Sequence, residues 1–245
     1  MALFALPLLQ TDICSAGAAA EQLALQEPLP VSAEELLPLK STHGVYLVKE
    51  GPEKGREVPF SLEQLGNRWI LTKEGLTRHE LQRDAHGNIL ILKETNLLEN
   101  RQVEYNPPIV LLPAVVNGNT SLAGKTRVTI KNAKTGAVTY RGECTWQLIF
   151  AGIESTETSS GTFSTYHFQV KHQIALPLAH ASLTIDFGYA IGKGMVVTAV
   201  DQVTRVFGLF SNRITWRLEQ KLAPVKPHPP RMADDGFVRL KTRDN

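Results

Sequence analysis

The stretch from Asn117 to Thr126 comes nearest to a phosphate-binding loop in this sequence. It ends in Gly-Lys-Thr, the residue types with which a P-loop holds phosphate against backbone N–H groups and a lysine. Five residues, however, separate Gly118 from Gly124 where the motif has four. Arg127–Ile130 then alternates like a strand, whereas phosphate needs the N-terminus of a helix. The spacing therefore predicts a turn between two strands and no nucleotide cofactor.

The other reactive side chains do not combine into a known catalytic or metal-binding pattern. Cys144 lies in an alternating apolar stretch, which predicts a small buried side chain rather than a nucleophile. His167 and His172 are five residues apart and so fall on opposite faces of a strand, without a Cys or acidic partner at ligand spacing. Glu154 and Glu157 could pair as acid and base, but carboxylates in a surface loop are usually solvated. We therefore predict no catalytic residue, no metal site and no cofactor.

Composition limits the classes of partner. The chain has 245 residues with 26 Lys and Arg against 24 Asp and Glu, a net charge of only +2. So small a charge gives little attraction to phosphate backbones, and no nucleic-acid partner is expected. Hydrophobic residues make up 42% and charged residues 20% of the chain, which supports a packed core. No apolar run reaches the roughly 18 residues of a membrane-spanning helix, so no transmembrane span is expected.

Residues 1–20 have features of a secretory signal peptide. A short apolar stretch precedes Ala18-Ala19-Ala20, which resembles a cleavage site, although no Lys or Arg occurs before Lys40. A frayed N-terminal segment or a buried helix is the alternative interpretation. Export to the periplasm is the prediction, and cleavage after Ala20 would leave Cys144 as the only cysteine, without a disulfide.

The remaining chain divides into three segments by composition. Residues 21–41 form an acidic leader in which Ser32 and Glu35 have capping-box spacing, and this predicts one short helical turn. Residues 42–222 alternate with the period of β-strands, although Ser61–Leu65 could form a helical turn. Residues 223–245 are a Pro-rich spacer and a polar tail.

Strict alternation within residues 42–222 predicts an antiparallel sheet with one dry face and one wet face. Turns are expected at His86–Asn88 and at Lys134–Gly136, and a bend or bulge at Gly188–Gly194. The dry face is the candidate ligand-binding surface. Its candidate lining residues are Tyr166, Phe168, Val170, Leu183, Ile185, Phe187, Ile214, Trp216 and Leu218.

Four stretches together carry a resemblance to a known group: Val103–Pro113, Ala151–Phe163, Phe187–Val196 and Phe207–Leu218. Their order resembles uncharacterised exported bacterial proteins of the LolA/LolB-like lipoprotein-carrier superfamily. The resemblance implies an all-β fold with minor α, a strongly curved antiparallel sheet forming an open or half β-barrel, and an apolar concave face for a lipid or acyl chain. The chain departs from the carriers in lacking clear lid helices, and no cargo-contacting residue can be matched.

The leading functional hypothesis is a non-enzymatic, extracytoplasmic protein that binds a lipid, acyl chain or other hydrophobic ligand on this concave face. The same residues could instead form a closed core. A second hypothesis is a structural or assembly module of the cell envelope. It would contact a protein partner through the C-terminal tail, which from Lys221 carries six Lys and Arg against three Asp. A hydrolase with an unrecognised site is the third.

Overall fold

The computed structural model describes residues 29–207 and 210–221. The predicted signal peptide at 1–20, residues 21–28 of the leader segment, and the tail at 223–245 lie outside the described residues. The elements are β1 (Val31–Ser32), α1 (Ala33–Leu36), β2 (Thr42–Glu50), β3 (Glu57–Leu65), β4 (Arg68–Lys73), β5 (Thr77–Arg83), β6 (Ile89–Asn96), β7 (Arg101–Leu112), β8 (Val115–Val116), β9 (Ser121–Asn132), β10 (Val138–Thr158), β11 (Gly161–Leu176), β12 (Ala179–Ala190), β13 (Gly194–Val206) and β14 (Phe210–Lys221).

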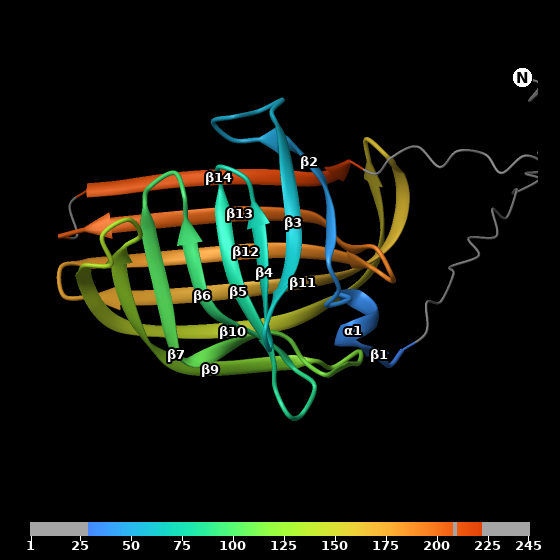
Figure 1. The fold of residues 1–245 in the computed structure, drawn as a ribbon, viewed down its shortest axis with the longest axis horizontal. Helices are drawn as coiled ribbons and strands as arrows, with labels where there is room; N and C mark the ends of the chain where they lie inside the picture. Colours follow the sequence, from blue (N-terminus) through green and yellow to red (C-terminus); the bar gives the residue numbers. More distant parts are fainter. Residues whose placement is uncertain (1–28, 208–209, 222–245) are drawn as a thin grey trace, which may run out of the picture.

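Twelve strands form one closed antiparallel barrel in the order β10-β11-β12-β13-β14-β2-β3-β4-β5-β6-β7-β9. The predicted all-β fold with a curved antiparallel sheet is confirmed. The curvature exceeds that of the expected open or half barrel, because β9 pairs with both β7 and β10 and closes the sheet. Strands β2 to β6 cross in front of strands β10 to β14, so the barrel is flattened into two crossing layers (Figure 1).

Register shifts beside two glycines, Gly152 and Gly188, mark β-bulges in the long strands of the second half. The register of β10 against β11 shifts between Phe150 and Gly152, where Gly152 has a φ of 130° that favours glycine. The register of β12 against β13 shifts between Gly188 and Tyr189, within the stretch where the sequence predicts a bend or bulge. A bulge bends its strand and increases the local twist, which a flattened closed barrel needs at its corners.

The predicted hairpin turns are confirmed. His86–Asn88 connects β5 to β6 and Lys134–Gly136 connects β9 to β10, and Gly87 and Gly136 have φ values of 91° and 72°. The P-loop-like stretch forms a turn that runs directly into β9. The helical turn suggested at Ser61–Leu65 is wrong, because these residues belong to β3 and pair with β2 and β4.

Helix α1 covers one end of the barrel (Figure 1). Its predicted capping box is present: the Ser32 hydroxyl accepts from the Glu35 N–H at 3.2 Å, and the Glu35 carboxylate accepts from the Ser32 N–H at 2.8 Å. The Gly192 N–H, in the turn between β12 and β13, donates to the Glu35 carbonyl at 2.9 Å. Leu36 is fully buried. These contacts hold the helix against the barrel although it is only four residues long.

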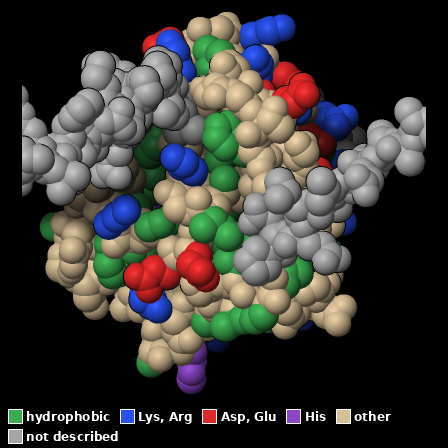
Figure 2. Space-filling view, turned by 90° about the vertical axis from the view of Figure 1, so that its right-hand side faces the viewer, with side chains coloured by type: hydrophobic (Ala, Val, Ile, Leu, Met, Phe, Trp, Pro, Cys, Tyr) green, Lys and Arg blue, Asp and Glu red, His purple; other side chains and the backbone are tan. Residues whose placement is uncertain are grey.

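Charge on the outside of the molecule is mixed. On the face that includes α1, Lys and Arg side chains lie scattered among acidic and apolar ones, and they form no single patch there (Figure 2). Within residues 29–207 and 210–221, no helix has the length and apolarity that a membrane span requires.

Candidate functional site

Two adjoining cavities occupy the interior of the barrel. They share five lining residues, which are Lys73, His79, Glu94, Ile185 and Phe187. The smaller cavity extends from these residues toward α1, where Leu37 contributes to its wall, and the larger extends toward the turn between β6 and β7, where Leu98 is 49% exposed. The cavities therefore form one interior site that reaches from the covered end of the barrel to a partly exposed side chain.

The volumes suit a slender ligand. Measured as the space open to the centre of a water molecule, the larger cavity has about 150 Å³ and the smaller about 50 Å³. One water needs about 10–15 Å³ on this measure, so the larger cavity has room for on the order of ten water-sized groups. A single acyl chain matches this space better than a lipid with several chains.

Seven of the nine candidate lining residues border these cavities. Val170 borders the smaller cavity, Ile185 and Phe187 border both, and the larger is also lined by Leu183, Ile214, Trp216 and Leu218.

Tyr166 and Phe168 border neither cavity and lie in the packed core. The Phe168 ring lies with its centroid 5.3 Å from that of Phe150 and 5.9 Å from that of Tyr189. The inward-facing side chains therefore fall into two groups. Some pack into an aromatic cluster that fills part of the barrel, and others line the cavities.

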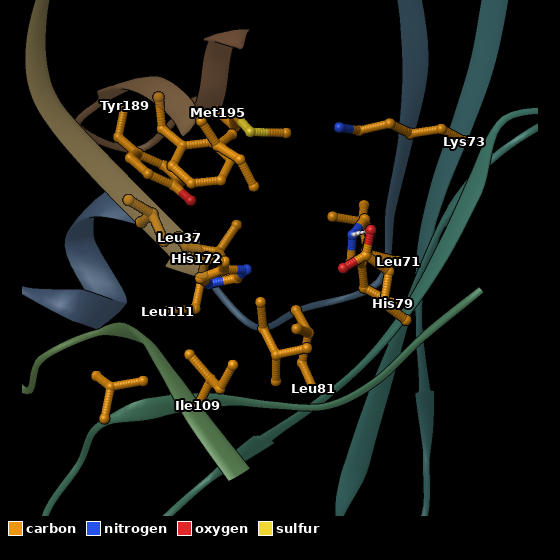
Figure 3. Close-up of a pocket in the computed structure, with 16 residues that line it drawn as sticks. Leu37, Leu71, Lys73, His79, Leu81, Ile109, Leu111, His172, Tyr189 and Met195 are labelled. Carbon is orange, nitrogen blue, oxygen red and sulfur yellow. Dashed lines mark ion pairs between the residues drawn. The ribbon is translucent and has the colours of Figure 1, made fainter. Parts of the chain in front are cut away.

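A cluster of ionisable side chains projects into this mainly apolar interior, and the sequence did not predict it. Lys73 on β4, His79 on β5 and Glu94 on β6 line both cavities, and His172 on β11 lines the smaller one (Figure 3). The Glu94 carboxylate lies 3.8 Å from His79 Nε2 and accepts a long hydrogen bond, 3.4 Å, from the Tyr105 hydroxyl. Lys73 Nζ lies 5.4 Å from the centroid of the Tyr46 ring.

Burial sets the charge states of this cluster. Desolvation lowers the pKa of Lys73 to about 8, although the Glu94 carboxylate acts in the opposite direction. Desolvation also lowers the pKa values of His79 and His172, again opposed by Glu94. At neutral pH the lysine is therefore mostly charged while both imidazoles are neutral, each with one N–H donor and one acceptor nitrogen.

Part of this cluster could have been predicted from the alternation of side chains along the strands. His172 has the same parity as Phe168 and Val170, and it is 3% exposed, so extending the inward face of β11 by one step would have included it. Glu94 could not be found in this way. A register shift between Ile91 and Lys93 reverses the parity of β6, so that Ile91 and Glu94 both face the cavity.

Keeping a lysine inside the barrel is expected to cost stability in a pH-dependent manner. The pKa of Lys73 falls from its ordinary value of 10.5 to about 8. At 1.36 kcal/mol per pKa unit, this decrease corresponds to about 3 kcal/mol of lost folding stability while the lysine is charged. Between these two pH values the unfolded chain binds more protons at this residue than the folded protein, so its contribution to stability rises with pH. We therefore expect Lys73→Met to be more stable than the wild type at pH 7 by about 1–3 kcal/mol.

This stability gain should shrink as the pH is raised from about 8 toward 10, and urea denaturation of both proteins at each pH measures it. Comparing the two proteins cancels the opposing contribution of Cys144, whose pKa burial raises to about 11. A difference in unfolding free energy that stays constant over this range would show that Lys73 titrates normally.

The other reactive residues lie outside the cavities. Cys144 is fully buried, as its alternating stretch predicts. Glu154 and Glu157 are exposed, but they belong to β10 rather than to a loop. Among the described residues, no group of three or more His, Cys, Asp or Glu side chains is arranged to hold a metal ion.

Comparison with known proteins finds only weak similarity to solved structures. No protein-family model matches the sequence, and no curated protein matches it significantly. Among solved structures, the chain is similar to the hypothetical lipoprotein YmcC from Escherichia coli, with 11% identity, coverage of 80% of this chain and 91% of that chain, and a TM-score of 0.41. It is also similar to an inferred lipoprotein from Parabacteroides distasonis, with 13% identity, coverage of 76% and 98%, and a TM-score of 0.37. At these scores the likeness assigns the chain to no family.

Proposed function

We propose that this chain is a non-enzymatic, extracytoplasmic protein that binds a lipid, an acyl chain or another hydrophobic ligand inside its barrel. One observation carries the proposal: two adjoining cavities in the barrel interior, walled mainly by apolar side chains of β4 to β7 and β11 to β14. Leu183, Ile185, Phe187, Ile214, Trp216 and Leu218 are the proposed contacts in the larger cavity.

Binding would be driven by removing apolar surface from water. At about 25 cal/mol per Å² of buried apolar surface, enclosing a medium-length acyl chain is worth several kcal/mol before the costs of ordering it. Interiors of β-barrels are known locations for such sites, because the inward face of each strand supplies a continuous apolar wall.

Filling the larger cavity tests the proposal. We expect the uncharged fluorescent probe N-phenyl-1-naphthylamine to bind the wild-type protein and to bind Ile185→Trp at least about tenfold more weakly, since the indole would occupy space that both cavities share. Titration of the probe by fluorescence measures both affinities. Thr184→Trp is the matched control, because Thr184 precedes Ile185 on β12 and points to the opposite face.

Equal affinity of Ile185→Trp and the wild type would mean that the probe binds elsewhere. Absence of probe binding would favour the second candidate, an envelope module that acts through protein contacts. One observation supports that candidate: Leu178 and Phe207 are 55% and 63% exposed on adjacent turns, joined by a 3.0 Å hydrogen bond from the Phe207 N–H to the Leu178 carbonyl.

The export part of the proposal has its own measurement. Intact mass of the protein purified from its native host reports whether the chain begins at Glu21, after cleavage behind Ala20, or retains its first residues. The same spectrum under native conditions reveals any lipid that remains bound.

A further inference from the structure

Lys73 is a charged side chain that forms no ion pair inside the cavity, among the described residues. It is 6% exposed, and among the described residues its ammonium makes no ion pair and donates no hydrogen bond; it lies 5.4 Å from the centroid of the Tyr46 ring. An ammonium group removed from water costs several kcal/mol unless it is paired. Figure 3 shows the side chain extended into the open space, with Nζ directed toward Met195.

Glu94 does not fill the role of counter-ion. Its carboxylate lies beside His79 Nε2 and the Tyr105 hydroxyl, on the side of the cavity formed by β5 and β7, and no ion pair joins it to Lys73. Its influence on the lysine is a longer-range attraction. Glu94 therefore attracts the ammonium across the cavity without pairing with it.

Two histidines add unused hydrogen-bonding capacity around the same space. His172 is 3% exposed, and neither of its ring nitrogens has a partner among the described residues. His79 Nδ1 is likewise buried without a partner. Such orphaned groups are rare in folded proteins unless a ligand or water satisfies them. Together with Lys73, they offer hydrogen-bond donors to a molecule in the cavity.

On the basis of the proposed function, we propose that the natural ligand is a single-chain amphiphile with a carboxylate head group, and that Lys73 receives this head group while the apolar walls enclose the chain. A carboxylate accepts hydrogen bonds only, and it forms strong charge-assisted bonds with an ammonium donor. An uncharged head group would leave the lysine unpaired, and a cationic one would be repelled by it. The volume of the larger cavity accommodates one slender chain.

Three probes with the same twelve-carbon chain test the head group: dodecanoate, 1-dodecanol and dodecyltrimethylammonium. They are titrated calorimetrically into the full-length protein at pH 7, the two ionic probes below their critical micelle concentrations and 1-dodecanol below its solubility limit. We expect dodecanoate to bind the wild type at least about tenfold more tightly than dodecanol, and dodecyltrimethylammonium to bind most weakly. In Lys73→Met the preference for dodecanoate over dodecanol should disappear, while dodecanol keeps its affinity. Lys125→Met, which alters an exposed lysine on β9, should behave as the wild type.

The outcomes separate this inference from the proposed function. Equal binding of dodecanoate and dodecanol, tighter binding of the ammonium probe, or an unchanged preference in Lys73→Met would overturn the carboxylate assignment, while binding of dodecanol would still support a hydrophobic site. Failure of all three probes to bind would overturn the proposed function as well. If Lys73→Met did not fold, the order of the three probes on the wild type would decide the question alone.

Discussion

Gly142→Ala is expected to prevent the barrel from reaching its folded state or to lower its unfolding free energy by about 3 kcal/mol or more. A β-carbon at this position would overlap the backbone carbonyl oxygen of Ala175 and come within 2.8 Å of Leu176 Cδ2. Neither strand can move away easily, because β10 pairs with β9 on one side and with β11 on the other. Circular dichroism and urea denaturation of the purified variant measure the loss.

Gly118→Ala is the matched control for this substitution. No atom lies within 4 Å of a β-carbon built at Gly118, and its φ is not in the left-handed region. Its stability should stay within about 1 kcal/mol of the wild type, with a small gain from reduced freedom of the unfolded chain. If both variants had similar stability, the close approach of β11 to Gly142 would not be a constraint on the fold.

Phe168→Ala is expected to destabilise the protein by about 3–5 kcal/mol, the usual cost of removing a fully buried aromatic ring. The side chain is 1% exposed and packs between Phe150 and Tyr189. Because Phe168 borders neither cavity, the affinity of the folded protein for dodecanol should change little. Urea denaturation measures the stability, and titration in the absence of urea measures the affinity.

Gln169→Ala provides the comparison on the opposite face of the same strand. Gln169 donates a 3.0 Å hydrogen bond to the exposed Asp186, and its loss should cost no more than about 1 kcal/mol. A Phe168→Ala protein that kept its stability but lost dodecanol binding would instead assign this ring to the ligand site.

Local pattern was sufficient to predict much of the fold. Tyr166, Phe168 and Val170 are buried on β11 while Lys171 is exposed, as strict alternation requires. The turns at Gly87 and Gly136 follow from the need for positive φ. Alternation could not separate core from cavity, however, since Phe168 and Ile185 both face inward and only the packing of the whole barrel decides which one borders empty space.

Closure of the sheet and the cluster of ionisable side chains depend on information that no single strand contains. Whether β9 pairs with β7, and so helps to close the barrel, depends on the order of all twelve strands and not on the residues of either strand alone. Lys73 has the inward parity of Leu71, yet a lysine is expected outside, so its burial contradicts the usual rule for charged residues. Glu94 needs the bulge at Ile91, and nothing in the residue types there marks it.

Strands β14 and β2 pair over only a short length. Within the described residues only five Cα pairs, from Arg217↔Glu50 to Lys221↔Val45, join these strands, fewer than at any other joint of the barrel. Ile214, Trp216 and Leu218 of β14 form part of the wall of the larger cavity. Separating these two strands would break few backbone hydrogen bonds and would open the wall of the larger cavity to the side.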